Sequence, residues 1–322
     1  MPNPSTDKIN YATILEKYPW LIQTDQKCVI SPDADGMLCG LFLSHFLNWQ
    51  VVGYYDNGKN LILKSGVRAR DCVFLDTEIY RPDIRSIGHH ISLFRKDDTD
   101  INMGNYVNCL NPNNLRYRTL KENFSLKYPM GTIHLLVSII GSTRNIDFSD
   151  ESFFTVLQAD GTINRFLDRY SDNLRSWLVY LGIEDEGSVF AKMLNKETTL
   201  LKINKEYVDY IQRFVKNKHD KIPVSEKGVI KDSSFNQERT SFSDDCTHST
   251  VEYLEFLSEN TGWKFDRSKW VFNGFCLYQF TKKTVKPGVR TFNMAVHENF
   301  LSLAITANDT MEYTLEEPGK LP

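Results

Sequence analysis

The sequence predicts an α/β protein with a mostly parallel sheet, helices on both faces, and a smaller α+β domain at the C-terminus. In the first half of the chain, short β-branched segments alternate with longer segments of helical spacing, which is typical of βαβ units. Near residue 195 the composition becomes polar and rich in lysine, and from about residue 250 aromatic residues dominate. We therefore predict a large domain over residues 1–195, a helical connector and linker over 196–245, and a small domain over 246–322.

The elements of the large domain follow from the spacing of its apolar residues. β-branched and aromatic runs predict strands, and apolar residues spaced three or four apart over ten or more positions predict helices. The segment "SFFTVLQAD" fits either type. Predicted strands cover residues 27–31, 50–55, 71–79 and a strand end before 88, whereas predicted helices cover 36–49, 130–141 and 161–183, the last as one helix. Beyond residue 250, residues 269–283 and 288–306 are expected to be rich in strand.

Composition excludes several classes of protein. The formal net charge is -3, so no overall basic field indicates nucleic acid, although a local basic groove is compatible with this value. None of the six cysteines form a Cys-x-x-Cys pair, which favours a reduced protein without a thiolate zinc site. The N-terminal segment has no apolar signal core, and no apolar run is long enough to span a membrane. We expect a cytoplasmic protein with no membrane partner.

Carboxylates and histidines follow the ends of several predicted strands. Sites in open α/β sheets form at the carboxyl ends of the strands, so these side chains should meet at one edge. Crowded carboxylates repel one another unless a cation joins them, and oxygen and imidazole ligands suit Mn²⁺ or Mg²⁺. The predicted ligands are Asp33, Asp35, Asp76, His89 and Asp160, and His90 lies beside them.

Each residue also has a simpler explanation. Asp33 and Asp35 could form a helix cap and turn, and Asp76 could cap the turn that follows it. Adjacent histidines are often a solvated pair, and Asp160 precedes a glycine, as in many ordinary turns. The ordered series favours a metal site, with Gly36 allowing a sharp turn into the helix.

The same residues resemble the motifs of the DHH phosphoesterase superfamily, most closely its RecJ-type exonuclease branch. The resemblance is collinear over roughly residues 25 to 185. The matching segments are "DADG" at 33–36, "VFLD" ending at Asp76, "GHH" at 88–90, Asn111-Pro112 with the segment after it, and Asp160 in "VLQADGTI".

Two positions depart from the family pattern. Relatives carry a His or Asp just before the first motif, where this chain has Val29 and Ser31. The first residue of the Asp-His-His motif is Gly88 here, which removes an acceptor that could orient an imidazole. One metal site is therefore weakened or lost, and an inactive relative that binds nucleic acid or a protein is an alternative.

The resemblance implies a hydrolase that binds one or two Mn²⁺ or Mg²⁺ ions and cleaves single-stranded nucleic acid or short oligonucleotides. Asp76 would bridge the two ions, and His90 would contact the scissile phosphate. A second alternative substrate is a cyclic or linear dinucleotide or another small phosphoester, which the modest charge favours.

The substrate is expected to lie between the two domains. Arg290 and His297 are candidate phosphate contacts from the small domain, and three nearby lysines could assist. The alternative is a solvated basic segment. The lysines are Lys282, Lys283 and Lys286, and the aromatic residues that could stack on bases are Trp263, Trp270, Phe272 and Tyr278.

Overall fold

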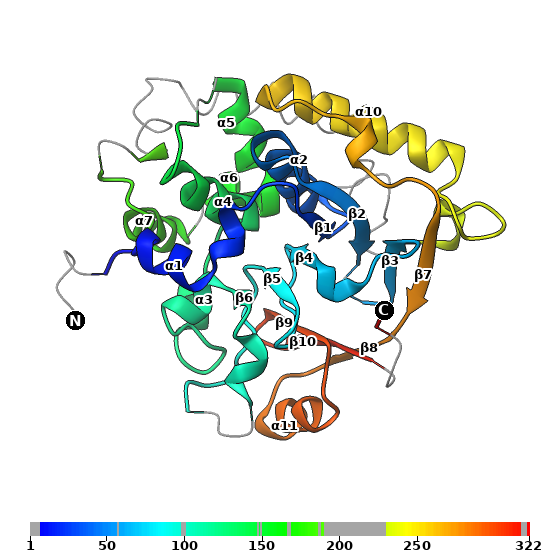
Figure 1. Cartoon of the computed structure of the whole chain (residues 1–322). Coiled ribbons are helices and arrows are strands. Elements are labelled where there is room, and N and C mark those ends of the chain that lie inside the picture. The colour runs from blue at the N-terminus through cyan, green and yellow to red at the C-terminus, as the bar shows by residue number, and fades with distance from the viewer. Residues whose placement is uncertain are drawn as a thin grey trace.

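A seven-stranded sheet forms the centre of the computed structural model, which describes residues 7–56, 58–97, 101–146, 148, 150–165, 169–185, 188–189, 230–316 and 321–322. The strand order is β6-β5-β4-β1-β2-β3-β7 (Figure 1). Neighbours from β6 to β2 are parallel, whereas β3 is antiparallel to both β2 and β7. This confirms the predicted α/β fold. The strands are β1 (Lys27–Ile30), β2 (Gln50–Tyr55), β3 (Asn60–Lys64), β4 (Cys72–Leu75), β5 (Arg85–Ile87), β6 (Cys109–Leu110) and β7 (Phe275–Gln279).

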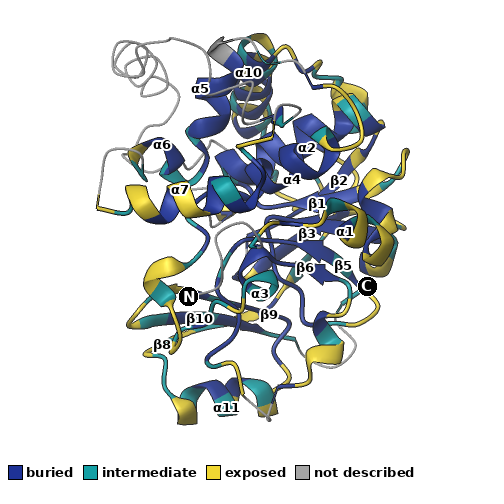
Figure 2. Ribbon diagram, turned by 90° about the vertical axis from the view of Figure 1, so that its left-hand side faces the viewer, coloured by how far each residue is buried: buried dark blue, intermediate teal, exposed yellow. Residues whose placement is uncertain are grey.

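Alternation along the strands sends side chains into two different cores. Cys28 and Ile30 of β1 pack into the largest apolar cluster, and Val29 between them packs into another on the opposite face. The largest cluster also contains the apolar sides of most described helices, which lie on one side of the sheet (Figure 2). These helices are α1 (Tyr11–Lys17), α2 (Ala34–Leu47), α4 (Thr132–Gly141), α5 (Asp150–Leu157), α6 (Thr162–Arg165), α7 (Ser171–Tyr180) and α10 (Asp244–Thr261).

The opposite face of the main sheet meets the C-terminal part of the chain. The predicted helices on both faces therefore need correction, because among the described residues the core of this face contains no residue of an α-helix. Phe280 and Leu301 pack with Val29 in the core of this face. They lead into a three-stranded antiparallel sheet in the order β8-β10-β9, which lies below the main sheet in Figure 1 together with α11. The elements are β8 (Thr281–Val285), α11 (Val289–His297), β9 (Ser302–Ala307) and β10 (Thr310–Leu315), and the short α3 (Pro112–Leu115) follows β6.

Three local predictions needed correction. "SFFTVLQAD" forms helix α5 followed by a 3₁₀ turn, so Asp160 follows a helix and not a strand. The single helix predicted over 161–183 is wrong, because α7 starts anew at Ser171 after Tyr170, whose backbone is not helical. Residues 288–306 are not strand throughout, because α11 occupies Val289–His297 with its apolar side on Phe292 and Ala295.

The predicted division into domains stays a prediction, but the structure constrains it. The limit at residue 195 lies outside the described residues, and the limit at 246 falls inside α10. Helix α10 packs against α5 and α2, and β7 pairs with β3 of the main sheet. The described end of the linker is also packed, since the rings of Phe235 and Phe242 stack 6.0 Å apart in the main core.

Within the described parts of the chain, no helix combines the length and the apolar character needed to cross a membrane.

Candidate metal centre

Four of the five predicted ligands meet at the carboxyl ends of the central strands, where the order of the strands reverses. Strand β1 lies between β2 and β4, so the segments that leave the carboxyl ends of β1 and β4 diverge there. Asp35 lies in the first turn of α2 after β1, and Asp76 directly follows β4. His89 follows β5, and Asp160 reaches the same edge from the turn after α5. The fold thus brings together carboxylates that are far apart in the sequence.

Four of these residues form one compact group. Ligand atoms of Asp35, Asp76, His89 and Asp160 all lie within 4.8 Å of one another, so the group could hold a metal ion. Asp35 is completely buried, Asp76 is 3% exposed and His89 is 8% exposed. Two buried carboxylates and the partly exposed Asp160 beside one imidazole leave an excess of negative charge, which a divalent cation would offset.

Asp35 is held by the first turn of α4. Its two carboxylate oxygens accept hydrogen bonds from the backbone N–H groups of Thr132 at 2.6 Å and Ile133 at 2.9 Å. These donors belong to the N-terminus of a helix, whose dipole also favours a negative charge. Burial nevertheless raises the pKa of Asp35 well above its ordinary value of 3.8, and the charges of Asp76 and Asp160 raise it further.

Asp76 is central in the group. Its backbone has φ of 61°, a left-handed conformation that aspartate adopts more readily than most residues. One carboxylate oxygen accepts from the Thr132 hydroxyl at 2.8 Å and lies 3.1 Å from Nδ1 of His89, and the other lies 2.6 Å from the Ser31 hydroxyl. Burial acts to raise the pKa of Asp76, but the hydrogen bond and charge of His89 outweigh it and hold this pKa below 3.8.

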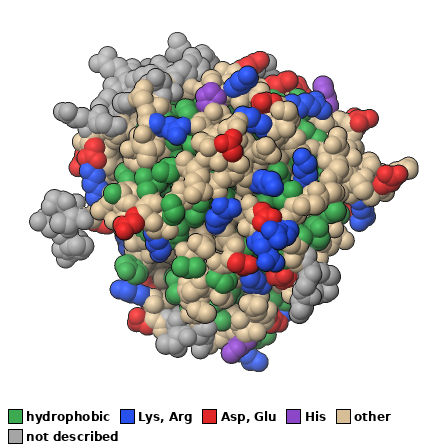
Figure 3. Space-filling view, in the orientation of Figure 1, with side chains coloured by type: hydrophobic (Ala, Val, Ile, Leu, Met, Phe, Trp, Pro, Cys, Tyr) green, Lys and Arg blue, Asp and Glu red, His purple; other side chains and the backbone are tan. Residues whose placement is uncertain are grey.

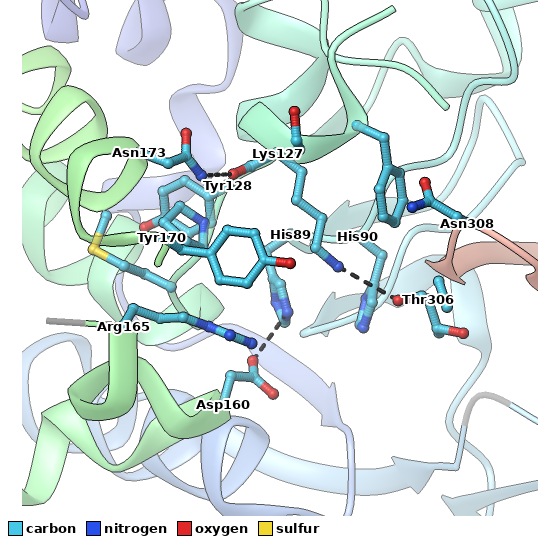
Figure 4. A pocket seen from close by; sticks show the side chains of 15 residues that line it. His89, His90, Lys127, Tyr128, Asp160, Arg165, Tyr170, Asn173, Thr306 and Asn308 are labelled. Carbon is cyan, nitrogen blue, oxygen red and sulfur yellow. Dashed lines mark hydrogen bonds and ion pairs between the residues drawn. The ribbon is translucent and has the colours of Figure 1, made fainter. Parts of the chain in front are cut away.

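His89 links the two sides of the group. Its Nδ1 faces Asp76 and lies 3.6 Å from Asp35, and its Nε2 lies 2.9 Å from a carboxylate oxygen of Asp160 (Figure 4). Burial alone would lower the pKa of His89, but the charges and hydrogen bonds of Asp160 and Asp76 raise it well above 6.5. The site therefore favours positive charge at its centre.

Asp33 lies outside this group of four. Its carboxylate caps α2 by accepting from the Gly36 N–H at 3.1 Å, and it lies 2.7 Å from the Ser31 hydroxyl. Its predicted role as a metal ligand stays a prediction. The reason given for Gly36 needs correction: Gly36 lies within α2, and a side chain there would collide with Ser31.

His90 is positioned by Glu78, which the sequence did not single out, and by Asn111 of the Asn-Pro segment. Its backbone N–H donates to Oε1 of Glu78 at 2.7 Å, and its carbonyl accepts from the Asn111 amide at 2.7 Å. The imidazole rings of His89 and His90 stack with centroids 4.3 Å apart. Glu78 follows Asp76 by two residues, and this spacing was the available signal for it.

A cavity of about 440 Å³ opens beside the group. His89, His90 and Asp160 line it, and Arg165 and Lys127 extend toward it from other walls (Figure 4). Burial, and then the nearby charge of Arg165, lower the pKa of Lys127. The other walls carry Phe124, Tyr128, Tyr170, Asn173 and the end of β9 with the residue after it, at Thr306, Ala307 and Asn308.

The substrate contacts predicted from the small domain do not line this cavity. Arg290 and His297 are exposed on α11. Two of the three lysines are paired with glutamates, Lys282 with Glu312 at 2.9 Å and Lys283 with Glu298 at 2.6 Å. Trp263, Trp270 and Phe272 are buried in the core, and Tyr278 is partly buried beside another core cluster.

No protein-family model, curated protein or solved structure matches this chain.

Proposed function

We propose that the protein is a metal-dependent phosphodiesterase that hydrolyses single-stranded nucleic acid or short oligonucleotides. The observation that carries this proposal is the position of the acidic group. Three carboxylates and an imidazole converge beside a cavity of about 440 Å³, within the usual range for ligand pockets, whose walls include Lys127 and Arg165.

Asp35, Asp76, His89 and Asp160 would hold one Mn²⁺ or Mg²⁺. The donor set fits such an ion, because hard carboxylate oxygens predominate and no thiolate belongs to the group. A bound divalent cation lowers the pKa of water, which makes water a nucleophile near neutral pH. The protein contributes rigidity, since Thr132 fixes both Asp35 and Asp76.

The cavity supplies contacts of the kinds that a nucleotide needs. Lys127 and Arg165 attract the phosphate by charge, and Arg165 can also bind two phosphate oxygens at once. Tyr170 and Phe124 offer aromatic faces for a base. His90, on the wall beside His89, would contact the scissile phosphate and stabilise the charge that develops on it.

A small phosphoester, such as a cyclic or linear dinucleotide, is the second candidate substrate. The cavity volume of about 440 Å³ suits a ligand of one or two nucleotides. On the face shown in Figure 3, Lys and Arg side chains are interspersed with Asp and Glu, so that face offers no continuous basic track for a long strand.

The test is cleavage of 5′-labelled single-stranded DNA and RNA 20-mers and of dinucleotides, with Mn²⁺, with Mg²⁺ and with a chelator. We expect metal-dependent cleavage that the Asp76→Ala variant lacks. A preference for the dinucleotide would favour the second candidate. Cleavage that continues in chelator, or in Asp76→Ala, would contradict the proposal, and cleavage of no phosphoester would favour a protein that only binds.

A further inference from the structure

Glu78 is a buried acid whose position the metal group does not explain. It is 2% exposed, and its ligand atoms do not belong to the group of four. Among the described residues, no lysine or arginine forms an ion pair with it. A buried carboxylate without a lysine or arginine partner is costly, so its other contacts must offset a large desolvation penalty.

The contacts of Glu78 converge on His90. Oε1 accepts from the His90 backbone N–H at 2.7 Å, and Oε2 lies 3.4 Å from Nδ1 of the same residue. Oε1 also accepts from the Asn111 amide at 3.2 Å, and that amide donates to the His90 carbonyl at 2.7 Å. Hydrogen bonds from one carboxylate and its amide neighbour therefore hold the His90 backbone, and the same carboxylate lies beside the His90 ring at ion-pair distance.

Gly88 leaves the space that this carboxylate fills. A Cβ at residue 88 would lie 2.6 Å from the carboxyl carbon of Glu78 and closer still to Oε1. The two positions are thus mutually exclusive: a side chain at residue 88 requires Glu78 to move. The absence of a carboxylate at residue 88 is matched by a carboxylate that reaches the same space from the segment after β4.

We propose that Glu78 is a positioning residue that holds the His90 imidazole against the cavity wall, in the space that Gly88 leaves open. The effect on turnover rests on the proposed function, because His90 acts there on the phosphate. The positioning itself does not depend on it.

The kinetic test is a double-mutant cycle between Glu78 and His90. With Mn²⁺ and a labelled 20-mer, Glu78→Ala should lower kcat about 10–100-fold, as loss of a supporting partner commonly does, with little change in KM or Mn²⁺ affinity. Because Glu78 acts through His90, the Glu78→Ala/His90→Ala double variant should match His90→Ala. Additive losses in the cycle, or wild-type kcat in Glu78→Ala, would overturn the proposal.

Two further variants separate positioning from folding. Glu78→Gln keeps the size of the side chain and an acceptor for the His90 N–H, so it should unfold like the wild type while kcat still falls about tenfold. Asp56→Asn is the matched control, since Asp56 is also a buried acid but has its partners in another turn. It should lower stability and leave kcat unchanged.

A measurement that does not depend on catalysis separates the positioning role of Glu78 from the proposed phosphodiesterase activity. In ¹⁵N-histidine spectra, Glu78→Ala should move the His90 ring signals more than those of His89, whose ring stacks on it. Gly88→Asp should disturb the His90 signals when Glu78 is present and less so in the Glu78→Ala background. If the protein cleaves no phosphodiester, the proposed function fails, and these spectra still decide the positioning role; unchanged His90 signals in Glu78→Ala would refute it.

Discussion

Two buried carboxylates follow neighbouring regions of the sheet, and their surroundings differ. Asp56, after β2, is 4% exposed, and Asp76, after β4, is 3% exposed. One oxygen of Asp56 accepts from the backbone N–H groups of Gly58, Lys59 and Asn60, and the other from the Asn60 amide and the Ile230 N–H. Apart from the Ile230 N–H, these donors all belong to its own turn, and among the described residues none of them donates to another acid.

Asp76 instead shares its partners with other acids. Its neighbours Ser31 and His89 also contact Asp33 and Asp160 respectively. A buried carboxylate at the end of a strand is therefore insufficient evidence for a site. The informative feature is how many acids the surrounding hydrogen-bond donors contact. In a turn the donors contact one acid, whereas in a cation site the same donors contact several acids.

The largest expected effect is on Mn²⁺ affinity, which should depend on Asp76 and not on Asp56. Asp76→Asn should reduce the affinity for Mn²⁺ more than about 100-fold, because it removes a ligand and not only a supporting contact. Asp56→Asn should bind Mn²⁺ like the wild type and lose about 1–3 kcal/mol of stability, since one oxygen loses its acceptor role. Calorimetric titration and thermal unfolding measure both. Equal Mn²⁺ affinity in the two variants would remove the distinction.

The pH dependence of stability should differ between the metal-free and the Mn²⁺-bound protein. The pKa of Asp35 is raised above 3.8 and that of His89 above 6.5, so folding favours their protonated forms. Their contributions to stability are present at low pH and are lost as pH rises through the folded pKa values. The lowered pKa of Asp76 acts in the opposite direction, but only as pH falls below 3.8.

Without metal, the free energy of unfolding should therefore decrease as pH rises above 6.5, by at most about 1.4 kcal/mol per pH unit for each group. Saturating Mn²⁺ should remove this decrease, because metal displaces the protons. Thermal unfolding from about pH 6 to 9 in chelator and in Mn²⁺ checks it. Asp56→Asn, as control, should shift both curves by a constant amount; a metal-free protein that gains stability over this range would contradict the assignment.

A smaller effect on KM should distinguish an aromatic residue of the cavity from one elsewhere on the surface. Tyr170→Ala should raise KM for a labelled oligonucleotide about tenfold or more, corresponding to about 1–3 kcal/mol for the stacking of one base. Tyr117→Ala is the control, because Tyr117 is 63% exposed and does not line the cavity. Steady-state kinetics measure both, and equal KM values in the two variants would mean that Tyr170 does not contact the substrate.

The pattern of apolar residues predicted β1, α2, β2, β4, β5 and α4, because each has the period of one structure type. The sequence also predicted that five residues would meet at one edge of the sheet, and four of them form the compact group, without Asp33. The shared edge of the parallel strands accounts for Asp35, Asp76 and His89, whereas Asp160 reaches the group from the turn after α5. The supporting contacts could not be predicted. Thr132 and Glu78 acquire their roles from partners 56 and 12 residues away, and no local pattern encodes such pairs.

Aromatic content misled the prediction in the C-terminal part. Phe292 belongs to a segment that was expected to be strand, yet it lies on the apolar side of α11 and is fully buried. Trp263 and Trp270 were candidates for base stacking, but they fill the core beneath α10 and α2. Aromatic residues bury well in either role, so their abundance does not distinguish a core from a binding surface.

The smallest expected effect concerns Asp33 and Asp35, and it tests whether a capping acid can be told from a metal-binding acid two residues away. Asp33 has the partners of a cap, so Asp33→Ala should lose about 1 kcal/mol of stability, as typical N-caps do. Its Mn²⁺ affinity should stay close to that of the wild type. Asn10→Ala is the matched control, because Asn10 caps α1 by accepting from the Thr13 N–H at 3.1 Å.

Similar losses of stability in the two cap variants, with Mn²⁺ binding retained in both, would assign adjacent acids to different tasks: Asp33 to the helix and Asp35 to the metal. If Asp33→Ala instead loses Mn²⁺ binding while Asn10→Ala keeps it, Asp33 is a ligand as the sequence predicted. The Ser31 hydroxyl, which contacts both Asp33 and Asp76, would then connect the group of four to Asp33, and the cation site would extend toward a second ion.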